Sequence, residues 1–111
     1  MLVGRSSPFG GQTRTRVLLL LQALGESFPR ELARVLEAPL FGVQKALQGL
    51  EKDGLVAART RGSIRLYVIN PAYFARETLA SYLDRLLEAE PEIGEAVSAL
   101  RRRPRRTGKK L

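Results

Sequence analysis

The stretch FPRELARVLEAPLFGVQKALQGLEKDGLV, residues 28–56, decides the fold. It predicts two short helices, because Pro39 breaks the chain in the middle and Asp53-Gly54 is a strong turn signal near the end. The second helix ends at Lys52, and its apolar residues recur at helical spacing. Its expected buried stripe consists of Val43, Leu47 and Leu50. Two helices joined by a short turn form a helix-turn-helix unit.

The rest of the chain adds one helix before this unit, and a hairpin and two helices after it. The predicted helices cover residues 13–24, 29–37, 41–52, 72–90 and 92–103, and the predicted strands cover residues 55–60 and 64–69. Thr13 and Ser27 are expected to cap the first two helices, and Gly62 lies in the hairpin link. This order predicts a mainly α fold with a small β-hairpin, a winged helix-turn-helix followed by C-terminal dimerisation helices.

Two motifs in the deciding stretch resemble those of ArsR-like and MarR-like winged helix-turn-helix regulators. The first has the form x-E-L-A-x-x-L and is met by Glu31, Leu32, Ala33 and Leu36. The second has the form L-x-x-L-E-x-x-G-L-V and is met by Leu47, Leu50, Glu51, Gly54, Leu55 and Val56. The resemblance covers about residues 13–70. It implies a transcriptional regulator that binds double-stranded DNA.

Composition argues against an enzyme. The chain contains no cysteine and no histidine, so thiol nucleophiles, thiolate metal sites and the commonest general base are all missing. We therefore expect no catalytic residues, no metal and no cofactor. The longest apolar run is Val17 to Leu21, far short of the roughly 20 residues that cross a bilayer. The sequence thus predicts a cytoplasmic protein with no membrane partner.

Charge divides the chain into three parts. Residues 1–65 hold 10 Lys/Arg and 5 Asp/Glu, giving +5; residues 66–100 hold 2 and 6, giving −4; residues 101–111 hold 7 and none, giving +7. We expect a flexible arm over residues 1–12, the winged helix-turn-helix over residues 13–71, C-terminal helices over residues 72–100 and a basic disordered tail over residues 101–111. The basic front and tail suggest a polyanionic partner; the alternative is a solubilising surface.

The outward positions of the helix that ends at Lys52 are candidates for contacts with bases. They are Phe41, Gly42, Gln44, Lys45 and Gln48. Glutamine can bond adenine with two hydrogen bonds, and lysine can bond guanine or a phosphate. The alternative is an ordinary solvated face. Phe41 could contact a thymine methyl group, belong to the core or mark a protein-binding surface, and we expect it in the core.

Arginines around the predicted hairpin offer phosphate contacts. The wing candidates are Arg59, Arg61, Ser63 and Arg65, and further candidates at helix starts are Arg14, Arg16 and Arg30. A wing arginine can cross the DNA backbone or enter the minor groove; the alternative is an exposed hairpin without a partner. A rival function also stays open, in which Leu40 and Phe41 dock a winged-helix interaction module on a protein.

The C-terminal helices carry a surplus of apolar residues. We expect the dimer interface to include Leu79, Tyr82, Leu83, Leu86 and Leu87. This expectation assumes that the winged helix completes its own core and leaves these residues exposed. The spacing of the leucines matches a helix seam. The alternative is that this segment folds back onto its own domain.

Overall fold

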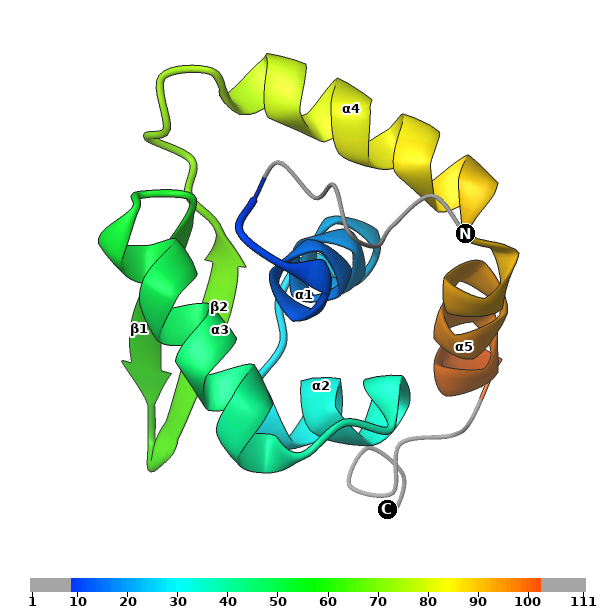
Figure 1. Cartoon of the computed structure of the whole chain (residues 1–111). Helices are drawn as coiled ribbons and strands as arrows, with labels where there is room; N and C mark the ends of the chain where they lie inside the picture. Colours follow the sequence, from blue (N-terminus) through cyan, green and yellow to red (C-terminus); the bar gives the residue numbers. More distant parts are fainter. Residues whose placement is uncertain (1–8, 103–111) are drawn as a thin grey trace.

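The computed structural model describes residues 9–102, and this part of the chain contains a helix-turn-helix, a hairpin and three further helices (Figure 1). The elements are α1 (Gln12–Leu24), α2 (Pro29–Leu36), α3 (Leu40–Lys52), β1 (Val56–Arg61), β2 (Ile64–Ile69), α4 (Arg76–Ala89) and α5 (Pro91–Arg102). Their order and type agree with the sequence prediction. The predicted fold class, mainly α with one small antiparallel hairpin, is therefore confirmed.

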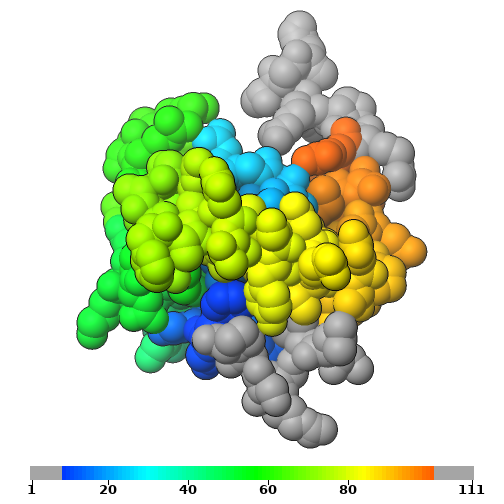
Figure 2. All heavy atoms as spheres, turned by 90° about the horizontal axis from the view of Figure 1, so that it is seen from above, coloured from blue at the N-terminus to red at the C-terminus, as the bar shows by residue number. Residues whose placement is uncertain are grey.

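Helix α1 lies at the centre of the molecule. All five residues from Val17 to Leu21 are buried. Because a helix has about 3.6 residues per turn, five consecutive side chains point in every direction around its axis. The other four helices and β2 all contact α1, and they surround it in Figure 1. Seen from above in Figure 2, α4 and the segment leading into it from β2 lie over the middle of α1. An apolar run without a polar face thus identifies the central helix.

Helices α4 and α5 complete the core of the same chain. Leu79 and Leu83 of α4 are buried, and so are Ile93 and Val97 of α5, in one cluster with the α1 leucines. The assumption that the winged helix completes its core without these helices is wrong, because α1 offers apolar surface on all sides and needs them as cover. The helix-turn-helix and the C-terminal helices share one core.

The turn between α2 and α3 sets the position of α3. Glu37 adopts a left-handed conformation at φ 54° and ends α2, while Pro39 precedes α3 in an extended conformation. Helix α3 then buries Val43, Leu47 and Leu50 against the core, as predicted. The hairpin follows in register from Val56 opposite Ile69 to Arg61 opposite Ile64. Its two-residue link contains Gly62 at φ +64°, a value that glycine adopts without strain.

Several predicted element ends differ from the structure. Gly11, not Thr13, precedes α1. Ser27 does not cap α2, because its backbone pairs with Tyr67 of β2 and its hydroxyl donates to Glu31 at 2.6 Å. Helix α4 begins at Arg76 instead of residue 72, because Asn70 holds the preceding turn by accepting from the Ala72 N–H at 2.9 Å.

The described part of the chain contains no helix long and apolar enough to span a bilayer. Residues 1–8 of the predicted N-terminal arm and residues 103–111 of the predicted tail lie outside the described residues. The first two residues of the predicted tail, Arg101 and Arg102, belong to helix α5. Of the predicted arm, Gln12 is already helical.

Candidate nucleic-acid interface

Helix α3 has one buried face and one exposed face. Gln44, Lys45 and Gln48 are exposed, whereas Val43, Ala46, Leu47 and Leu50 on the other side are buried. Gly42 is half-buried, and open space surrounds the position where its side chain would begin. The structure therefore brings the predicted base-contacting residues together on one accessible surface. We call Phe41, Gln44, Lys45 and Gln48 the exposed face of α3.

The acidic groups at the C-terminal end of α3 are paired with arginines from other elements. Glu51 accepts from Arg65 of β2 at 2.9 Å. Asp53, the residue after the helix, accepts from Arg14 of α1 at 3.0 Å. These pairs offset two negative charges that follow the exposed face along the chain.

Arg65 is held on several sides. Its Nε donates to the Tyr67 hydroxyl at 3.0 Å, and its guanidinium lies 5.6 Å from the Tyr67 ring centroid. The hydrogen bond to Tyr67 and, next, the one to Glu51 raise the pKa of Arg65 above its ordinary value. Arg65 therefore joins the hairpin to α3, which fixes the wing relative to the exposed face.

The remaining predicted arginines separate into accessible and occupied groups. Arg30 and Arg61 are exposed, as is Ser63 at the hairpin tip. Arg59 is exposed but pairs with Glu26 at 2.8 Å. Arg16 is half-buried beside the end of α2 and the start of α5, where its Nε is buried and has no hydrogen-bond partner within residues 9–102. Arg30 and Arg61 are thus the best placed of these residues for phosphate contacts.

Arg14 is also held by several contacts. Besides Asp53, its guanidinium donates to the Phe9 carbonyl at 3.1 Å. The same group lies over Gly49 of α3, and a Cβ atom at that position would collide with it. Arg14 therefore packs α1 against α3.

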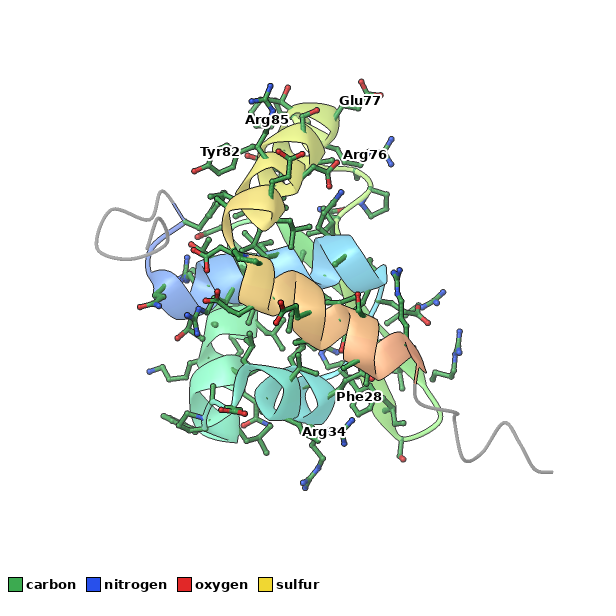
Figure 3. All side chains as sticks on the ribbon, turned by 90° about the vertical axis from the view of Figure 1, so that its right-hand side faces the viewer. Phe28, Arg34, Arg76, Glu77, Tyr82 and Arg85 are labelled. Carbon is green, nitrogen blue, oxygen red and sulfur yellow. The ribbon has the colours of Figure 1, made fainter. Side chains whose placement is uncertain are left out.

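Two exposed residues differ from the sequence prediction: Phe41 was placed in the core, and Arg34 was not among the candidates. Phe41 was expected in the core, but it is 71% exposed, because it lies on the same side of α3 as Lys45, four residues later. Arg34 was not considered, although it lies four residues after Arg30 and is exposed like it. Figure 3 shows Arg34 extending from α2 at the end of the molecule opposite Arg76 and Arg85 of α4.

The predicted dimer residues do not share one environment. Leu79 and Leu83 are buried within the chain, whereas Leu86 and Leu87 are half-buried against the core. Tyr82 is 41% exposed, and the Phe9 ring lies 5.8 Å from its ring. Only Tyr82, Leu86 and Leu87 of the five therefore offer surface to a second copy.

Comparisons with known proteins show the fold. No protein-family model and no curated protein matches the chain. A singly substituted variant of ZitR from Lactococcus lactis aligns with a TM-score of 0.52 at 22% identity, over 90% of this chain and 80% of that chain. A doubly substituted ZitR variant in apo form aligns with a TM-score of 0.52 at 21% identity, over 75% and 66% respectively. The fold is a winged helix.

A third similar structure is AdcR, the adhesin competence repressor from Streptococcus pyogenes. It aligns with a TM-score of 0.49 at 20% identity, over 79% of this chain and 75% of that chain.

Within residues 9–102, no group of three or more acidic, histidine or cysteine side chains is arranged to hold a metal ion.

Proposed function

We propose that this protein is a DNA-binding transcriptional regulator. Helix α3 would lie in the major groove, and the hairpin would contact the backbone or the minor groove. The observation that carries the proposal is the exposed face of α3, which presents two amides and one cation while the acids that follow them are paired with arginines. The resemblance of residues 28–56 to ArsR-like and MarR-like regulators supports the same function.

The side chains suit a division of roles between bases and phosphates. Gln44 and Gln48 are one helical turn apart and can bond base edges, with adenine as the preferred partner of glutamine. Arg30 on α2 and Arg61 on the hairpin are exposed on the elements that flank α3. They would contact phosphates, which position a protein on DNA but carry no sequence information.

The phosphate contact of the wing can be tested by replacing Arg61. We expect Arg61→Ala to weaken binding to unrelated duplexes and to reduce the slope of log affinity against log salt by about one unit. Arg85→Ala is the matched control, because Arg85 is exposed on α4, away from the proposed interface. Fluorescence anisotropy over a salt series measures both. Equal salt slopes for both variants would show that Arg61 of the wing does not contact DNA.

We further propose that the protein acts as a homodimer through α4 and α5. The half-buried Leu86 and Leu87 and the partly exposed Tyr82 supply the apolar surface, and the segment is acidic, which favours an orientation away from DNA. A two-fold dimer would present two α3 helices to half-sites about one helical turn apart.

Sedimentation equilibrium tests the dimer. We expect twice the chain mass of 12.3 kDa for the wild-type protein at micromolar concentration, and a shift towards the single chain for Tyr82→Glu. Leu83→Glu is unsuitable as a test, because Leu83 is buried within the chain and a charge there would unfold it. A wild-type mass of a single chain would contradict the dimer.

A further inference from the structure

Phe41 is the unexplained residue of the exposed face. It is the second residue of α3 and is 71% exposed, although Leu40 beside it packs against the core. Its ring contributes little to the core of the chain, and exposing an aromatic ring to water is unfavourable. A function in binding would account for a phenylalanine at this position.

Lys45 orients the ring. Its Nζ atom lies 5.6 Å from the centroid of the Phe41 ring, a distance at which a cation is attracted to an aromatic face. The two residues are four positions apart and therefore neighbours on the helix surface. The aromatic ring is thus held beside a cation, and most of its surface stays accessible.

The surroundings of the ring carry a positive charge, which suits a polyanion such as a nucleic acid better than a purely apolar partner. Lys45 is the only charged residue between Leu40 and Leu50 of α3, and Gly42 leaves open space next to Phe41. The N-terminal residues of a recognition helix are those that contact base edges. In the major groove, the apolar group that a base offers to a phenylalanine is the 5-methyl group of thymine.

We propose that Phe41 contacts the 5-methyl group of a thymine and thereby helps to select an A·T pair in the bound site. This inference rests on the proposed function, since it places α3 in the major groove. It adds an apolar contact to the hydrogen bonds expected from Gln44 and Gln48, and it gives Lys45 a second role as the residue that positions the ring.

The experiment begins by enriching sites for the full chain from a random duplex library. Each thymine of the enriched site is then replaced in turn by deoxyuridine, which removes only the methyl group. We expect one position per half-site at which the wild-type protein loses about fourfold in affinity, the equivalent of about 0.8 kcal/mol for one buried methyl group. Phe41→Ala should bind the thymine and uracil sites equally, and Phe41→Leu should keep part of the preference.

Phe74→Ala is the control, because Phe74 is an aromatic residue that is 91% exposed in the turn before α4. This variant should keep the full thymine preference, and thermal melting should show that all three variants fold. A wild-type protein that binds every uracil site as tightly as the parent site would overturn the inference and leave the proposed function standing. The same holds if Phe41→Ala keeps the thymine preference. Failure to enrich any site would overturn both.

Discussion

Helices α1 and α3 have 13 residues each but opposite relations to solvent. Helix α1 buries five consecutive apolar residues from Val17 to Leu21 and has other elements on all sides. Helix α3 buries one stripe and leaves Phe41, Gln44, Lys45 and Gln48 exposed. Helix α1 therefore organises the core, and helix α3 combines a buried face with a surface available for binding.

The arginines follow the same division. Arg14 and Arg65 are arginines of the basic first half of the chain, as are the accessible Arg30 and Arg61. Unlike those two, they pair with acids at the end of α3. They connect the central helix and the hairpin to α3 and so hold its exposed face in position. A basic patch in sequence therefore contains both residues that build the surface and residues that are free to bind.

The largest expected effect is a loss of stability on truncating the central helix. Leu19 lies outside the stripe that an ordinary one-faced helix would bury, yet it is fully buried here. We expect Leu19→Ala to lower the free energy of unfolding by about 2–5 kcal/mol, the range for truncating a buried leucine. Urea denaturation measures this change. A cost below about 0.5 kcal/mol, as at a surface position, would show that α1 is not surrounded.

A smaller effect is expected on the exposed face of α3, and it should concern DNA alone. Gln44→Ala should reduce the discrimination between the enriched site and random duplex by about 1–3 kcal/mol, the contribution of a base-contacting side chain. Stability should stay unchanged, since Gln44 is exposed. Gln12→Ala, an exposed glutamine at the start of α1, is the control for competition binding, and equal discrimination by both variants would argue against a base contact by Gln44.

The smallest effect compares two glycines of α3. Gly42→Ala should stabilise the protein by about 0.5–1 kcal/mol, because alanine favours a helix and open space receives the methyl group. Gly49→Ala should gain less, because the new methyl group displaces Arg14 and weakens its pair with Asp53. Thermal unfolding of both variants tests the difference. An equal gain would mean that Arg14 does not pack on Gly49 in solution.

The helix-turn-helix was predictable because its signals are local. Val43, Leu47 and Leu50 recur at helical spacing, and Pro39 and Gly54 bound the element, so a short window of sequence contains the whole pattern. The outward positions Gln44, Lys45 and Gln48 follow directly from that stripe. Phe41 was misplaced, because an aromatic residue next to a core position is usually buried with it, and only the orientation of the helix shows otherwise.

The pairing of charges and the cover of α1 were not predictable in this way. Arg14 and Asp53 are 39 residues apart, and their contact depends on how α1 crosses α3. The burial of Leu79 and Leu83 likewise depends on whether α1 offers one apolar face or several. Both depend on long-range packing, and the periodicity of apolar residues within one helix does not predict such packing.

The most direct test of the proposed DNA interface compares two lysines of the same helix. Lys45 belongs to the exposed face of α3, whereas Lys52 is exposed at its C-terminal end, next to the paired acids. Lys45→Glu and Lys52→Glu make the same charge change in the middle and at the C-terminal end of α3. Anisotropy titrations with the enriched site compare the two variants. We expect a loss of at least about tenfold in affinity for Lys45→Glu and a clearly smaller loss for Lys52→Glu. Equal losses, or a larger loss for Lys52→Glu, would contradict the proposed interface.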